Sequence, residues 1–105
     1  MTAATLVPVF AALGHDTRWS ILAALGNGEA SASVLATTLP VTRQAIAKHL
    51  AILKDAGLVE PVPAGREVRY RALGSELTAA ARRLEEIGIA WDRRLAEIKR
   101  IAEEL

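Results

Sequence analysis

One stretch of the chain carries side chains suited to binding a polyanion. From Val41 to Lys54 there are three cations and no acidic residue. If it is helical, its first two turns form a face without large apolar groups, made of Thr42, Arg43, Gln44, Ala47 and Lys48. An arginine can donate two hydrogen bonds to guanine and a glutamine can pair with adenine, while threonine and lysine suit phosphates. The chemistry that this face predicts is the binding of double-stranded DNA.

The apolar residues of the same stretch predict how that face is held. Large aliphatic side chains recur at helical spacing and should face a core, namely Ile46, Leu50 and Leu53. Thr42 can accept a hydrogen bond from a free N–H group of the first turn, and Gly57 can end the helix. We therefore expect a helix that is buried on one side and presents its cationic face outward.

A shorter helix should come immediately before this one. Ser31 is its best cap, and the helix should run as far as Leu39. Pro40 closes it, because the residue before a proline avoids helical backbone angles. Only Pro40 and Val41 then separate the two helices, which predicts a tight turn between them.

Two short runs after the second helix predict a β-hairpin. The runs LVEPV (58–62) and EVRYRAL (67–73) mix apolar with polar residues, and residues 63–66 should form the turn between them. Pro61 has no amide donor, so it belongs where no ladder hydrogen bond is needed.

Three arginines lie on this hairpin. Arg66 and Arg69 flank the turn and are candidates for contacts with the DNA backbone or minor groove, the alternative being a solvated hairpin. For Arg71 we prefer the solvated interpretation. A short helix, a tight turn, a second helix and a hairpin make a winged helix-turn-helix. The predicted fold class is therefore mainly α with a small β-hairpin (α+β).

Two more helices are expected at the N-terminal end. Pro8 fits the first turn of a helix, where its missing N–H has no cost, and Gly14 should end that helix. Asp16 can cap the next helix. Its expected inward residues are Trp19, Ile21, Leu22 and Leu25, and residues 26–28 should end it.

Residues 75–105 predict one long dimerisation helix. Leu77, Leu84, Trp91, Ile98 and Leu105 recur every seven residues, with Ala81, Gly88, Leu95 and Ala102 four positions on. About 30 helical residues extend about 45 Å, farther than the rest of a small domain can cover. Packing against the N-terminal helix of the same chain is one interpretation, but we favour a homodimer of first and last helices. The expected interface residues are Val9, Phe10, Leu13, Leu77, Leu84, Ile87, Trp91, Leu95 and Ile98.

Composition narrows the class of protein. The 105 residues suit one domain, residues 1–105, and the net charge of +1 argues neither for nor against nucleic acid. There is no cysteine, which excludes thiol catalysis and thiolate metal sites and is compatible with the cytosol. No run reads as a signal peptide or membrane span. No phosphate loop or nucleophile motif is present, so we expect neither an enzyme nor a cofactor.

The segments ALGHDTRWSILAAL (12–25) and SVLATTLPVTRQAIAKHLAILKDAGLVEPVPAGREVRYRAL (33–73) carry a resemblance. They are similar to the arsenic-repressor (ArsR/SmtB) family of bacterial winged-helix transcription factors, over roughly residues 10–73. The most specific piece is AIAKHLAILKDAGLV followed by the REVRYR wing. The resemblance implies a cytoplasmic, obligate dimer that binds a partly palindromic operator and represses transcription.

The family often senses metal ions, and here the chain departs from it. Many members have a cysteine pair where this chain has SVLATTL, and others have Asp and His ligands on the last helix, which here has no histidine. Only His15 and His49 exist, and neither belongs to a visible ligand cluster, so we expect no metal site. The segment WDRRLAEIKR resembles a non-metal branch whose members commonly repress their own operon without a known ligand.

Some roles remain open at this point. We favour a structural His49, at the core edge and bonded to backbone, over one that contacts DNA, and a turn residue at His15 over a ligand or switch. Arg18 could bind a phosphate or pair with a carboxylate. Two alternative functions also stand: a protein-interaction dimer that does not bind DNA, and a repressor that responds to an unidentified small molecule.

Overall fold

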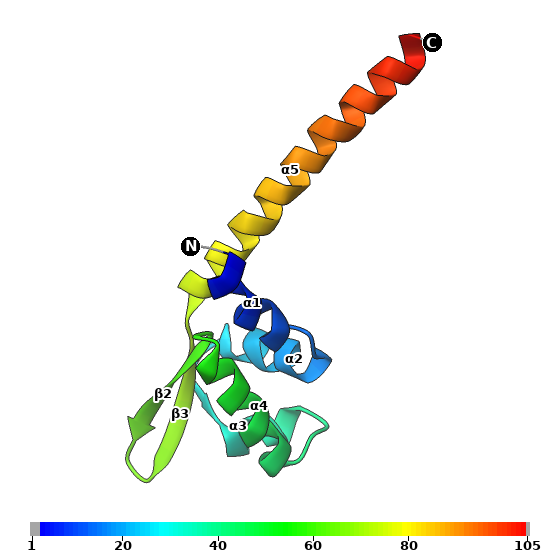
Figure 1. Ribbon diagram of the computed structural model, residues 1–105. Coiled ribbons are helices and arrows are strands. Elements are labelled where there is room, and N and C mark those ends of the chain that lie inside the picture. Colours follow the sequence, from blue (N-terminus) through cyan, green and yellow to red (C-terminus); the bar gives the residue numbers. More distant parts are fainter. Residues whose placement is uncertain (1–2, 105) are drawn as a thin grey trace.

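The helix-turn-helix lies between two N-terminal helices and a hairpin. The computed structural model describes the backbone of residues 3–104 and the side chains of residues 6–104. Along these residues run α1 (Ala3–Ala12), α2 (Asp16–Leu25), β1 (Ala30–Ser31), α3 (Ala32–Thr38), α4 (Arg43–Asp55), β2 (Val59–Ala64), β3 (Glu67–Ala72) and α5 (Gly74–Glu104) (Figure 1). The strands form one antiparallel sheet in the order β1-β3-β2. The expected winged helix-turn-helix fold is confirmed.

The predicted caps are confirmed at two of three helices. The side chain of Ser31 accepts a hydrogen bond from the backbone N–H of Val34 at the start of α3. The hydroxyl of Thr42 accepts one from Ala45 at the start of α4. At α2 the prediction is wrong by one residue: His15 is the cap, because its Nδ1 accepts from the N–H of Thr17, 3.1 Å away. Asp16 is instead the first helical residue, where its carboxylate still faces the positive end of the helix dipole.

Two expectations for the N-terminal helices are also corrected. Pro8 lies inside α1 rather than in its first turn, since the helix already begins at Ala3. Trp19 was expected in the core, yet 57% of it is exposed. Its indole N–H donates to the carbonyl oxygen of Leu13, 2.6 Å away, which holds the ring across the α1–α2 connection.

The hairpin is longer and its turn tighter than expected. Pro63 and Ala64 continue β2, so the turn consists only of Gly65 and Arg66. Gly65 has a φ of +67°, which glycine adopts without strain at such a turn. Pro61 lies on β2, an edge strand of the sheet, as its missing donor requires. β1 was not expected, because a strand of two residues shows no periodicity.

One aliphatic core joins the elements other than the outer part of α5. Its buried side chains are Leu6, Val9, Ala12, Ile21, Leu22, Leu25, Leu35, Ile46, Leu50, Leu53, Leu58, Val59 and Ala80. All three anchoring residues predicted for α4 belong to it. Burying these anchors fixes α4 against α2, α3 and β2 and determines which face of the helix meets solvent.

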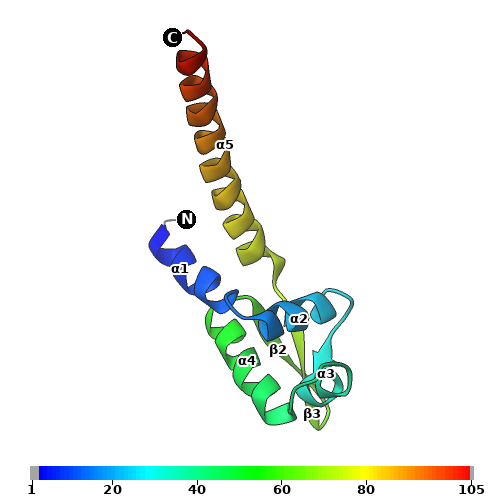
Figure 2. The same ribbon diagram turned by 90° about the vertical axis from the view of Figure 1, so that its right-hand side faces the viewer.

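The helix α5 leaves the domain as a rod (Figures 1 and 2). It begins at Gly74, one residue before the expected start, and its 31 residues extend about 46 Å. Only its first turns contact α1, and Ala80 is its one buried residue within the described side chains. The described part of the chain is therefore 69 Å long but only 28 × 21 Å across. No helix within residues 3–104 is long and apolar enough to cross a bilayer.

Candidate nucleic-acid interface

The first two turns of α4 present the predicted cationic face to solvent. Ile46, Leu50 and Leu53 are completely buried on the opposite side of the helix. The side chains predicted for DNA contact on this helix are all exposed, and they are Thr42, Arg43, Gln44, Ala47 and Lys48. The helical period therefore separates an anchoring face from an open one, as a helix entering a DNA groove requires.

A groove separates this face of α4 from the hairpin. Its volume is about 440 Å³, and its lining comes from the first half of α4, the start of α3 and the outer half of β3 with the turn. It is lined by Ser31, Ala32, Ser33, Arg43, Gln44, Ala47, Arg66, Glu67, Val68 and Tyr70. The fold thus brings Arg43, Gln44 and Ala47 together with Arg66, although about twenty residues separate them in the chain. Thr42, Lys48 and Arg69 are exposed but do not line the groove.

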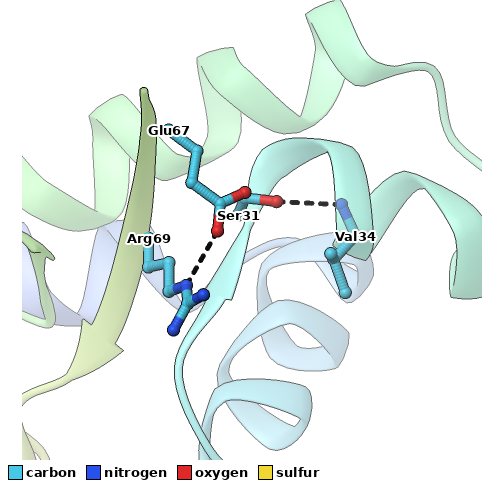
Figure 3. Close-up of polar contacts among 4 residues, drawn as sticks. All are labelled: Ser31, Val34, Glu67 and Arg69. Carbon is cyan, nitrogen blue, oxygen red and sulfur yellow. Dashed lines mark hydrogen bonds and ion pairs between the residues drawn. The ribbon is translucent and has the colours of Figure 1, made fainter. Parts of the chain in front are cut away.

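The three hairpin arginines differ in their charge partners. Arg69 donates from Nε to Oε1 of Glu67, 2.9 Å away, and Figure 3 shows this pair on β3 beside the capped start of α3. Arg71 binds Glu60 across the hairpin, and this hydrogen bond, followed by the carboxylate's charge, raises the pKa of the guanidinium. Among the described side chains, Arg66 forms no ion pair. Arg66 is therefore the hairpin cation that is free to meet an external anion.

The cations of α4 are equally uncommitted. Neither Arg43 nor Lys48 forms an ion pair with a described side chain. The hydroxyl of Thr42 accepts from the N–H of Ala45, which leaves its own proton able to donate to a phosphate. The free N–H groups of the first turn add partial positive charge at the same end of α4. Chemically, this end of the helix can bind anions and offer hydrogen bonds at once.

Arg18, His15 and His49 form one structural cluster between α2 and α4. The Nε of Arg18 donates to the carbonyl oxygen of Ala12, and its Nη1 lies 3.3 Å from Nδ1 of His49. Among the described side chains Arg18 pairs with no carboxylate, so that alternative is not seen, and His49 is bonded to a side chain rather than to the expected backbone group. The His15 ring lies 4.5 Å from that of His49. Burial, then the charges of His15 and Arg18, lower the pKa of His49.

Six residues that line the groove are missing from the sequence-based prediction, namely Ser31, Ala32, Ser33, Glu67, Val68 and Tyr70. They belong to elements whose pattern signals only a cap, a turn and a strand. Tyr70 pairs with Ala30 of β1, and that pairing brings β3 beside the start of α3. A contact made through an unexpected strand leaves no signal in local spacing.

The outer turns of α5 carry an uncovered apolar stripe. Of the residues predicted for the dimer, those beyond the first turns of α5 are exposed, namely Leu84, Ile87, Trp91, Leu95 and Ile98. Phe10, Leu13 and Leu77 are half-buried against the core. Val9 is the exception, because only 1% of it is exposed and it packs within its own chain. The position of Leu105 lies outside the described residues.

No group of three or more potential metal ligands occurs among the described residues. His49 lies beside the Arg18 guanidinium, whose positive charge opposes the approach of a cation, and the His15 ring lies next to that of His49.

Comparison with known proteins identifies the family. A helix-turn-helix domain model matches residues 13–62. The chain is 38% identical over 81 residues to the HTH-type transcriptional regulator CmtR of Mycobacterium tuberculosis. The aligned region covers 77% of this chain and 69% of the relative. It is 65% identical to the solved ArsR-like transcriptional regulator from Rhodococcus sp. RHA1, with a TM-score of 0.83 and coverage of 94% of this chain and 93% of that one.

A second solved structure shows the same fold at lower identity. It is described as the homodimeric winged helix-turn-helix DNA-binding domain of Mb0332 from Mycobacterium bovis, a possible ArsR-family regulator. The identity is 28% and the TM-score 0.66, over 88% of this chain and 82% of that one. The chain belongs to the ArsR family of winged helix-turn-helix transcriptional regulators.

Proposed function

We propose that the chain is a dimeric, sequence-specific transcriptional repressor that inserts α4 into the major groove of an operator. The observation that carries this proposal is the groove between α4 and the hairpin. Arg43, Gln44 and Arg66 all line it, and neither arginine pairs with a carboxylate among the described side chains. A major groove about 12 Å wide admits a helix whose outer side chains are small or hydrogen-bonding.

Each side chain of this face has a distinct role in the proposal. Arg43 forks onto guanine and Gln44 pairs with adenine, because both bear the two hydrogen-bonding groups that such pairs need. Thr42 and Lys48 bind phosphates and so fix the position of the helix. Ala47 lets the helix approach the bases. Arg66, at the hairpin turn, contacts the backbone or the minor groove beside the same site.

The dimer follows from the stripe on α5. Leu84, Trp91, Leu95 and Ile98 are each more than half exposed and lie along one face at heptad spacing. Water contact with so long an apolar stripe is unfavourable, and a second copy supplies a matching surface. Leu77 begins the same heptad series at the start of α5, where α5 contacts α1, and we place the first helix of each subunit against this end of the stripe, with the half-buried Phe10 and Leu13 at the interface.

A symmetric dimer predicts the form of the operator. Two copies related by a two-fold axis present two α4 helices, so their half-sites read as a partly palindromic sequence about 10 bp apart, or a multiple of that. Occupying such a site next to a promoter blocks transcription of the neighbouring genes, and we propose that these include the regulator's own gene in a bacterial cytoplasm.

Selection of bound sequences from a pool of random duplexes tests the proposal. We expect enrichment of two inverted half-sites, with guanine and adenine at the positions facing Arg43 and Gln44. A protein that enriches no sequence and passes through immobilised duplex DNA at low salt would instead be a protein-interaction dimer. Enrichment of a single, unpaired site would contradict the proposed dimer but not the proposed DNA binding.

A further inference from the structure

The groove contains one charge of the wrong sign for its proposed ligand. Glu67 is the only acidic residue among those that line it, and the other two charged residues of the lining are Arg43 and Arg66. It follows the Gly65–Arg66 turn directly, at the outermost rung of the hairpin, where it pairs with Ala64. Phosphates repel a carboxylate, so this residue opposes the binding that its neighbours favour.

The carboxylate also occupies an arginine. Oε1 of Glu67 accepts from Nε of Arg69 at 2.9 Å, and both side chains are about half exposed (Figure 3). A guanidinium bound in this way has one donor fewer for a phosphate and stands beside a negative charge. Of the two hairpin arginines nearest the turn, only Arg66 is left without such a partner among the described side chains.

We infer that Glu67 is an electrostatic brake, which holds Arg69 away from the phosphate backbone and so weakens binding to every duplex. The inference rests on the proposed function, since it assumes that the groove receives DNA. The brake acts on affinity without reading sequence, because backbone contacts carry no base information. A regulator with this brake depends more on Arg43 and Gln44 and less on phosphate contacts, which favours release from non-specific DNA.

The test is the salt dependence of binding to a random duplex, measured for Glu67→Gln. This variant frees Arg69 for one additional phosphate, so we expect tighter binding and a salt slope steeper by about 0.9. Its gain over the wild type should therefore shrink about 3.5-fold between 50 and 200 mM salt. In the double variant Glu67→Gln/Arg69→Gln, the slope should return to that of the wild type.

Glu60→Gln is the matched control. It removes the same charge from the hairpin and frees Arg71 in the same way, but Glu60, unlike Glu67, does not line the groove, and Arg71 lies farther from the turn than Arg69. We expect a smaller change in slope, which separates a local effect from that of net charge. Equal slopes for the two variants, or Glu67→Gln binding no more tightly than the wild type, would overturn the inference.

Two other outcomes have separate meanings. Weaker binding of Glu67→Gln only to cytosine-containing sites would show that the carboxylate reads a base, which also overturns the brake. A wild-type protein that binds no duplex at any salt concentration would refute the proposed function itself. Circular dichroism of each variant establishes that these exposed substitutions leave the fold intact.

Discussion

Replacing Leu95 by alanine tests the proposed dimer at a position where the expected loss of association free energy can be calculated from the structure. Leu95 lies on the outer part of α5, is 57% exposed and contacts no other element closely enough to be buried. Alanine favours helix at least as well as leucine, so α5 should keep its helical structure. The substitution therefore changes the stripe with little effect on the fold of the isolated chain.

The expected cost follows from the exposed fraction. Removing three carbons costs about 2.4 kcal/mol when all are buried, at about 0.8 kcal/mol each. Because 57% of Leu95 is still exposed in the single chain, a partner can bury a share worth about 1.4 kcal/mol. Both copies lose this share, about 2.7 kcal/mol in total, which corresponds to about a 100-fold rise in the dimer dissociation constant.

Sedimentation equilibrium over a range of concentrations measures that constant. Ile89→Ala is the matched control, since Ile89 is also on α5 and 45% exposed, but lies about 160° around the helix from Trp91. We expect the control to dimerise like the wild type. If Leu95→Ala leaves the constant unchanged, or if both variants weaken it equally, the heptad face is not the subunit interface.

Three further predictions concern α4, the helix that we propose binds DNA, and the residues that support it. Gln44→Ala should relax the preference for one base at a cost of about 1–3 kcal/mol, as binding to single-base operator variants would measure. Lys48→Ala should weaken binding to all sequences alike and lower the salt slope by about one unit; a change confined to one base would contradict its assignment to phosphate. The lowered pKa of His49, caused by burial and then by the charges of His15 and Arg18, means that the unfolded chain binds a proton more readily. The contribution of neutral His49 to the free energy of unfolding should therefore be present in full above about pH 6.5 and be lost as the pH drops through the folded-state pKa. The loss would be measured as a lower urea midpoint. This loss should be smaller in His49→Gln.

Local signals predicted the elements that position the site. Ser31 and Thr42 act as caps because a hydroxyl one residue before a helix can reach free N–H groups without any tertiary contact. The anchors Ile46 and Leu50 follow from helical periodicity alone, and their burial turns the polar face outward. The exposed position of Gln44 is thus a consequence of spacing in the sequence.

Features that depend on how strands pair and on which hydrogen-bond partners the folded chain offers were missed. Trp19 has the size and polarity of a core residue, but the Leu13 carbonyl offers its N–H a partner at the surface. Glu67 and Tyr70 enter the groove because β3 pairs with the short β1, and a strand of two residues leaves no pattern to detect. The ion pair of Glu67 depends on the rotamers of the folded hairpin, which a list of residues does not contain.

The length of α5 beyond the domain bears on how the regulator would accumulate in a cell. In the proposed dimer, each newly made copy would expose its α5 leucine, isoleucine and tryptophan side chains to water until it binds a second copy. The rate of association of two subunits rises with the square of the monomer concentration. At low concentration the copies therefore remain monomers, which chaperones and proteases can bind. In the proposed dimer, association through α5 would therefore give the regulator a threshold concentration, below which a target promoter stays free and above which repression rises steeply.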